Sequence, residues 1–285
     1  MRGSTRVTGW RRIASAMWRA PDDPQIYGAL DIDAGPLLRF IARAEHAGQR
    51  VTPTHLVGRA LAYALEMVPD LNVSIHGGSA RPRPSVDIFF ITAVSSGRDL
   101  SGVKIEDVPY KTAVDVATEL THKSRELKQG TDREFRRTKS LMDHTPMFLL
   151  RSVLRLSATL TETLGLDLPV LGLHKAPFGS AMVTSVGMFG LPQGFAPIAW
   201  MYDVPVLVLV GELTERPVVV DGRVEARTIL PITATIDHRY VDGWHVSRAM
   251  AAFREYLASP DLFEPLADAP REPLPRAEHE RMASP

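Results

Sequence analysis

The chain of 285 residues contains no cysteine, which excludes disulfide bonds, thiolate metal sites and a cysteine nucleophile. It has no excess of either charge, because 33 Lys and Arg residues balance 33 Asp and Glu residues. A formal net charge of zero gives no overall attraction to nucleic acid or to an anionic membrane, so no nucleic-acid partner is expected. The first residues lack the apolar core of a signal peptide, which argues against export and leaves the cytoplasm as the default compartment.

The sequence also lacks two motifs with defined chemistry. It has no glycine-rich phosphate loop and no Gly-x-Ser-x-Gly turn, so nucleotide-binding and serine-hydrolase functions lose their usual support. What is present is enough apolar sequence, 45% of the residues, for one large core. Apolar residues at helical spacing predict helices at residues 10–19, from 36 to at least 44, and at 53–68, 112–128 and 147–164. Alternating or β-branched runs predict strands at residues 27–33, 86–94, 181–186, 204–213, 217–220, 224–228 and 232–236, and residues 98–104 are predicted to be a loop.

The most informative stretch runs from Ile232 to Met250 and is predicted to be a strand, a turn and a helix. His238 falls where the strand gives way to the turn, a place where a rigid element can hold a base at an exposed site. An imidazole titrates near neutrality, so it could take a proton from a thiol or a hydroxyl group. Asp242 precedes the helix directly and is expected either to cap its backbone N–H groups or to bind an arginine. On spacing alone, a surface histidine followed by a capping aspartate is an equal alternative.

The run from Asp237 to Gly243 resembles the His-x-x-x-Asp-Gly signature of the catalytic domain of dihydrolipoamide acyltransferases. These proteins are the acyltransferase components of 2-oxo-acid dehydrogenase complexes, and chloramphenicol acetyltransferases are related to them. The block Gly179–Gly190 is similar to the Thr-x-Ser-Asn-x-Gly segment of the same family. Further similar segments follow the family's order and extend the resemblance over most of residues 10–257: Arg11-Arg12-Ile13-Ala14 with Met17, Pro69–Asn72 and Phe195–Ile198.

The resemblance implies an α/β protein with the chloramphenicol acetyltransferase-like CoA-dependent acyltransferase fold, a mixed β-sheet flanked by helices. It implies His238 as general base, with Asp242 and Gly243 completing the signature. Alignment on Gly187 places Thr184 where the family has an oxyanion-stabilising serine, and Ser185 where it has asparagine.

The resemblance also implies an assembly and a set of substrates. The family's active site lies between subunits of a trimer, so a homotrimer or a multiple of three is expected. Arg11 or Arg12 is the expected partner of Asp242, as a structural salt bridge. Coenzyme A or an acyl-CoA is expected as substrate, and no metal is expected.

Residues 131–175 depart from the family pattern, in which a shorter connection is found. They contain a basic cluster, Arg133 to Lys139, and the predicted helix at 147–164. Charges inside this helix argue against a membrane span. Two interpretations remain: a helix packed on the core or on a neighbouring subunit, or an interfacial helix that touches a membrane or a partner.

The predicted organisation is therefore one catalytic domain at residues 1–259, with an atypical insertion at about 131–175, and a proline-rich disordered tail at residues 260–285. No lipoyl or peripheral subunit-binding domain is expected on this chain. The first hypothesis is a CoA-dependent acyltransferase that moves an acyl group between CoA and a thiol acceptor. The acceptor would be a dihydrolipoyl group on a lipoyl-bearing protein in trans, or another small molecule.

The alternative is a catalytically weak or inactive scaffold that assembles as trimers or larger particles. His238 and the hydroxyl at position 184 favour the enzyme. The serine at position 185 and the insertion favour the scaffold.

Overall fold

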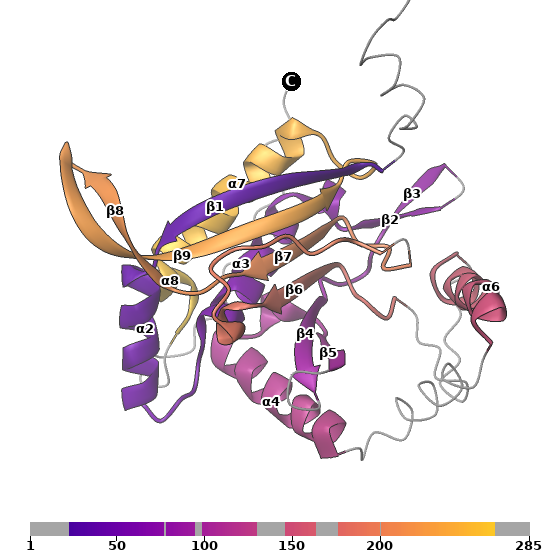
Figure 1. Ribbon diagram of the computed structural model, residues 1–285, viewed down its shortest axis with the longest axis horizontal. Coiled ribbons are helices and arrows are strands. Elements are labelled where there is room, and N and C mark those ends of the chain that lie inside the picture. Colours follow the sequence, from indigo (N-terminus) through magenta and orange to yellow (C-terminus); the bar gives the residue numbers. More distant parts are fainter. Residues whose placement is uncertain are drawn as a thin grey trace, which may run out of the picture.

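The computed structural model describes residues 23–76, 78–94, 99–129, 146–163, 176–199 and 201–265. In these residues a mixed β-sheet has the strand order β1-β9-β7-β6-β4-β5, with β8 paired to the first half of β9 (Figure 1). Strand β6 runs parallel to both β4 and β7, and the other pairs are antiparallel. The strands are β1 Gln25–Asp33, β4 Ile88–Val94, β5 Asp99–Ile105, β6 Ala181–Ser185, β7 Val206–Val210, β8 Thr214–Val220 and β9 Arg223–Asp237; β2 Val73–His76 and β3 Ser79–Pro82 form a separate hairpin.

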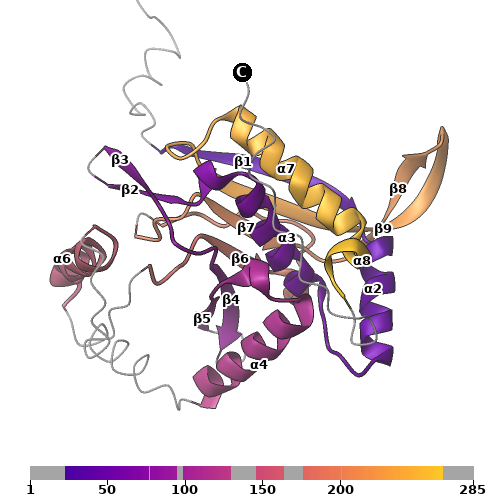
Figure 2. The same cartoon turned by 180° about the vertical axis from the view of Figure 1, so that it is seen from behind.

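Helices cover one face of this sheet, with α3 and α7 packed side by side across it (Figure 2). The helices are α2 Gly35–His46, α3 Pro53–Met67, α4 Ala113–Gln129, α6 Met147–Ala158, α7 Gly243–Ala258 and α8 Pro260–Phe263. Shorter helical segments are η1 Pro69–Leu71, η3 Val108–Tyr110, the π-helical η4 Thr159–Thr163 and η6 Gly187–Phe189. None of the helices in the described ranges is long and apolar enough to cross a membrane.

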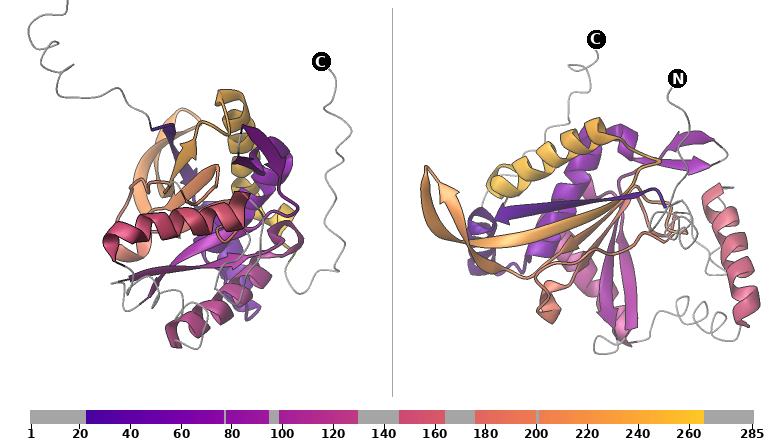
Figure 3. Two further views of the ribbon diagram at one scale, coloured as in Figure 1. Left: turned by 90° about the vertical axis from the view of Figure 1, so that its right-hand side faces the viewer. Right: turned by 45° about the horizontal axis from the view of Figure 1, so that its top comes forward.

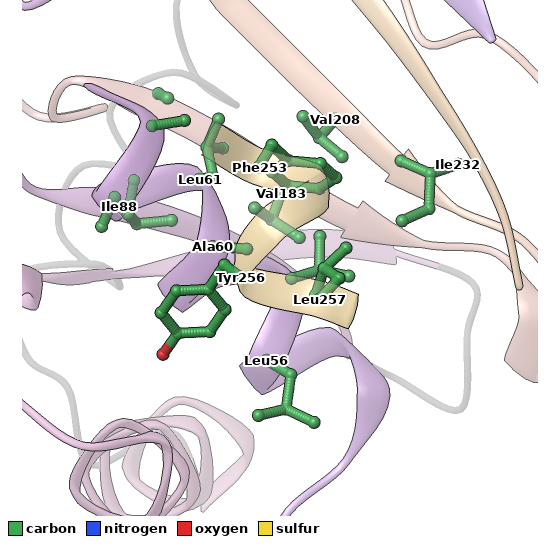
Figure 4. Close-up of a cluster of buried hydrophobic side chains, with 14 of the residues drawn as sticks. Leu56, Ala60, Leu61, Ile88, Val183, Val208, Ile232, Phe253, Tyr256 and Leu257 are labelled. Carbon is green, nitrogen blue, oxygen red and sulfur yellow. The ribbon is translucent and has the colours of Figure 1, made fainter. Parts of the chain in front are cut away.

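The core lies between the sheet and this helical layer (Figure 4). Every side chain of β7 is buried, which explains its uninterrupted Val-Leu-Val-Leu-Val sequence. Edge strand β1 instead alternates between more and less exposed residues, because only one of its faces packs on helices. Helix α3 approaches the sheet closely at Gly58, where a Cβ atom would lie 2.3 Å from the Phe90 ring.

The other face of the sheet is covered in part by the segment between β6 and β7. Met182, Val204 and Leu207 form a small buried cluster there, packed against Phe178 and Tyr202 among others. The hairpin of β8 and β9 projects from the body of the molecule (Figure 3). The molecule is therefore a helical layer on a sheet, with irregular chain on the second face.

Three sequence predictions are corrected by these elements. Residues 99–105, predicted to be almost entirely a loop, form β5 and pair with β4 along its length. The strands predicted at 224–228 and 232–236 are one continuous strand, β9. Pro231 does not interrupt it: its carbonyl accepts a hydrogen bond from the Gly211 N–H at 2.9 Å, and its missing N–H would face the same side, so the pairing of Pro231 with Asp31 of β1 loses no hydrogen bond.

The third correction concerns the C-terminal end. The predicted disordered tail begins at residue 260, but Pro260 starts helix α8 and Glu264 is 2% exposed. Glu264 accepts hydrogen bonds from Arg59 Nε at 2.9 Å and from the Ala113 N–H at 2.6 Å. The folded region thus reaches at least residue 265. The helix predicted at 10–19 lies outside the described residues.

Candidate active site

The turn that carries His238 begins at the last residue of β9 and is held from both sides. The Asp237 N–H donates to the Pro205 carbonyl, and the His238 N–H donates to the Pro24 carbonyl, each at 2.9 Å. His238 itself is exposed, whereas Asp237 before it and Tyr240 after it are buried. The turn is therefore rigid in its backbone and open to solvent at the histidine.

The His238 ring has a defined orientation. Its Nδ1 atom is in hydrogen-bond contact with the carbonyl oxygen of Val241. A carbonyl can only accept, so Nδ1 carries the proton in the neutral ring. Nε2 then holds the lone pair. The geometry suits His238 to the role of a general base that acts through Nε2.

Side chains around the turn fix its shape. Arg239 pairs with Asp237, whose Oδ1 accepts from Arg239 Nε at 3.0 Å, and this hydrogen bond raises the pKa of the Arg239 guanidinium. The Tyr240 hydroxyl donates to Asp203 Oδ1 at 2.5 Å. Burial, reinforced by this hydrogen bond, raises the pKa of Tyr240, so it remains a donor at any working pH.

Asp203 in turn binds Arg83, with Arg83 Nη2 3.0 Å from Asp203 Oδ2. This connects the turn to the residues before β7 and to the end of the small hairpin. Arg83, Asp203 and Tyr240 support the site without having been predicted from the sequence. Only Tyr240 carries a signal for this role, since it falls inside the His-x-x-x-Asp-Gly run; nothing in the sequence connects the other two to His238.

Asp242 caps helix α7, which is one of the two roles that the sequence predicts for it. Its carboxylate accepts hydrogen bonds from the backbone N–H groups of Trp244 at 3.0 Å and His245 at 3.3 Å, and Gly243 is the first residue of the helix. The His245 ring adds a contact at 2.8 Å, which lowers the pKa of Asp242. The expected partners Arg11 and Arg12 lie outside the described residues. Among the described residues, Asp242 is thus bound by backbone N–H groups of its own helix and by the His245 ring. The Nε2 atom of this ring also lies 3.7 Å from Asp70 Oδ2.

Thr184 and Ser185 end strand β6 and are half-buried. A Cβ atom at the following Gly187 would lie 2.5 Å from the Gly211 carbonyl oxygen, so the chain there requires glycine. These features place the predicted oxyanion donor on a rigid strand end.

The structure does not bring Thr184 and His238 together within one chain. Thr184 is opposite Leu209 of β7, which is opposite Thr233 of β9. His238 lies beyond Thr233 by a further run of strand of about 17 Å, and two strand spacings add about 10 Å sideways. The two residues are therefore about 20 Å apart, at opposite ends of β6 and β9, whose arrowheads point in opposite directions in Figure 1.

No group of three or more His, Asp or Glu side chains in the described ranges is placed to hold a metal ion.

Solved structures share this fold along most of the chain. A probable dihydrolipoamide acetyltransferase from Listeria monocytogenes superposes with a TM-score of 0.62 at 17% identity, covering 94% of this chain and 97% of that one. The cubic core of a pyruvate dehydrogenase multienzyme complex gives 0.60 at 19% identity, covering 85% and 84%. The truncated catalytic core of a Thermoplasma acidophilum 2-oxoacid dehydrogenase complex gives 0.57 at 17% identity, covering 91% and 99%. The fold is therefore that of the acyltransferase cores of 2-oxoacid dehydrogenase complexes, as the sequence predicted.

A family model assigns the chain to a family. The model of the 2-oxoacid dehydrogenases acyltransferase (catalytic domain) matches residues 4–135 and 173–264, and the chain belongs to this family. Residues 136–172, which the model leaves unmatched, fall inside the segment 131–175 that departs from the family pattern.

Curated relatives agree with the family assignment. One is the acetyltransferase component of the pyruvate dehydrogenase complex of Zymomonas mobilis, 22% identical over 264 residues, 90% of this chain and 50% of the relative. The Rickettsia bellii component is 26% identical over 203 residues, 71% and 38%. The chain spans half or less of the length of these two relatives.

Proposed function

We propose that this protein is a CoA-dependent acyltransferase that moves an acyl group between CoA and a thiol acceptor, with His238 as general base. The observation that carries the proposal is the His238 ring, exposed on a rigid turn with Nδ1 occupied by the Val241 carbonyl. Nε2 is then the basic atom. A thiol with a pKa of about 8.5 is within reach of such a base.

Acyl transfer would pass through a tetrahedral intermediate. His238 Nε2 takes the proton of the acceptor thiol, and the sulfur forms a bond to the carbonyl carbon of the acyl-CoA thioester. The carbonyl electron pair moves to oxygen and gives a tetrahedral oxyanion. When the oxyanion collapses, the bond to the CoA sulfur breaks and this sulfur takes the proton back from His238. The acyl group has changed thiols, and the base is restored.

The oxyanion requires a hydrogen-bond donor, and we assign the Thr184 hydroxyl to this role. Since Thr184 and His238 are about 20 Å apart in one chain by strand geometry, the donor would come from a second copy. A trimer or a multiple of three supplies such a pairing at each interface. The similarity to the cubic core of a dehydrogenase complex supports an assembly of this kind.

Two comparisons support the choice of residues and acceptor. One similar structure is that of the Azotobacter vinelandii dihydrolipoamide acetyltransferase, at 19% identity and a TM-score of 0.60. It belongs to an investigation of the roles of a serine, a histidine and an asparagine in the catalytic mechanism of that enzyme. That histidine and asparagine are four residues apart, as His238 and Asp242 are here. The curated relatives are named dihydrolipoyllysine-residue acetyltransferases, which favours a dihydrolipoyl acceptor carried by another protein.

The direct test is transfer from acetyl-CoA to dihydrolipoamide, followed by formation of the acetylated dithiol. The His238→Ala variant should be slower by about two to four orders of magnitude, the contribution of a general base. His122→Ala is the matched control, because His122 is an exposed histidine on α4 whose ion pair within the described residues is with Glu126 of its own helix. A wild-type rate no higher than that of His238→Ala would refute the acyltransferase function and favour the alternative, an assembling scaffold.

A further inference from the structure

An apolar cavity of about 140 Å³ lies between the sheet and helices α3 and α7. Its walls come from β1, β7 and β9 on one side and from the two helices on the other. Four lining residues, Leu61, Val208, Ile232 and Phe253, are labelled in Figure 4. Protein interiors contain few voids larger than a water molecule, so a cavity of this size within a packed layer requires a reason.

Small residues converge to create the cavity. Gly28 of β1 faces Ala234 of β9 across the strand pair, and Ala64 and Ala249 contribute from the helices. On β1, Gly28 alternates with exposed Tyr27 and Ala29, so a side chain at position 28 would point toward the helices. A Cβ atom there would meet nothing within 4 Å, which contrasts with the tight contact at Gly58 in the same layer.

The cavity adjoins the turn that carries His238. Ile236 and Val241, on either side of the histidine, both line it. The Cα of Ile236 is at most about 7.6 Å from that of His238, because two peptide units separate them. The Val241 carbonyl is also the group that orients the His238 ring. Met250, another lining residue, is 40% exposed, so the cavity reaches the surface beside α7.

We propose that this cavity binds the hydrocarbon chain of the transferred acyl group, with the thioester outside at His238. The inference rests on the proposed function and gives it a substrate class, acyl groups of about four to six carbons. An apolar cavity of about 150 Å³ is known to hold benzene, so the volume suits about six carbon atoms. The lining is almost entirely apolar: Thr233 is the one lining residue with a polar side chain, and its hydroxyl already donates to the Gly194 carbonyl, so the cavity accepts a hydrocarbon far better than a charged or polar group.

The test is equilibrium binding of acetyl-CoA and hexanoyl-CoA to the full chain in the absence of an acceptor thiol. Hexanoyl-CoA should bind at least tenfold more tightly, since its extra methylenes leave water for the cavity. Gly28→Val and Ala249→Leu each place a side chain in the void and should bring the ratio of the two affinities close to one. Ala251→Leu is the matched control: the same change on the exposed side of α7, which should keep the wild-type ratio.

A second readout, stabilisation against heat by benzene, does not depend on acyl transfer. Wild type should be stabilised, and Gly28→Val should not. If both CoA esters bind equally well and Gly28→Val changes nothing, the inference is overturned while the proposed function stands. If benzene binds the cavity but neither CoA ester binds the protein, the assignment to an acyl chain falls together with the proposed function.

Discussion

His55 gives the fold a pH dependence that can be worked out from the structure. It is the third residue of α3, and its Nδ1 accepts a hydrogen bond from the Thr52 N–H at 3.1 Å as part of a capping box. Burial lowers the pKa of His55 from 6.5 to about 4. A proton on Nδ1 would also displace this hydrogen bond and put a positive charge at the positive end of the helix dipole.

The sign of the effect follows from proton linkage. Between pH 6.5 and about 4 the unfolded chain binds a proton at His55 and the folded chain does not. The free energy of unfolding therefore falls as the pH falls through this window and levels off below it. From pH 7 to pH 4.5 the loss due to His55 is about 2 kcal/mol.

The perturbation is His55→Gln, which keeps an acceptor for the Thr52 N–H but does not titrate. Urea unfolding of wild type and variant at one protein concentration, at pH 7 and pH 4.5, isolates the contribution of His55, because the other titrating groups are common to both. Wild type should lose about 2 kcal/mol more than the variant. Equal losses would mean that folded His55 is protonated as readily as the unfolded residue, and would refute the reasoning.

The buried ion pair between Arg59 and Glu264 and the segment 131–175 can each be tested by one change. Glu264→Ala leaves the Arg59 guanidinium, which is 3% exposed, without its buried carboxylate partner. The free energy of unfolding, measured in urea, should therefore fall by about 3–5 kcal/mol. A loss below about 1 kcal/mol would show that the ion pair is dispensable. Replacing residues 131–175 with a short linker should leave transfer to free dihydrolipoamide intact and weaken recovery of the native acceptor or partner in a pull-down. Equal recovery by both proteins would make the insertion structural.

Local signals were sufficient where an element is specified by its own residues. Thr52-Pro53 predicted the start of α3, and the run at residues 86–94 predicted β4. Strand β5 could not be found this way, because its glycine and polar residues are poor strand formers. Gly102 is explained only by the fold: a Cβ atom there would lie 2.1 Å from the Phe89 ring on the paired strand.

The same distinction applies to the site. His238 and Asp242 lie in one short run, so the sequence could identify both and could give the helix cap as one of two roles for Asp242. Asp203 and Arg83 support the turn from distant parts of the chain, and their roles depend on tertiary contacts that no local pattern encodes. The separation of Thr184 from His238 depends on strand order and direction, which become known only with the sheet.

The central claim is that each active site combines His238 of one copy with Thr184 of another. The most direct test uses two variants, His238→Ala and Thr184→Ala. They are mixed in equal amounts, unfolded and refolded together, and then assayed for acyl transfer. Each variant alone should be slower than wild type by at least about two orders of magnitude. In a cyclic assembly about one interface in four then joins an intact His238 to an intact Thr184, so the mixture should recover about a quarter of the wild-type rate. A mixture no faster than the average of the two variants, with mixed assembly verified by mass spectrometry, would contradict the shared site.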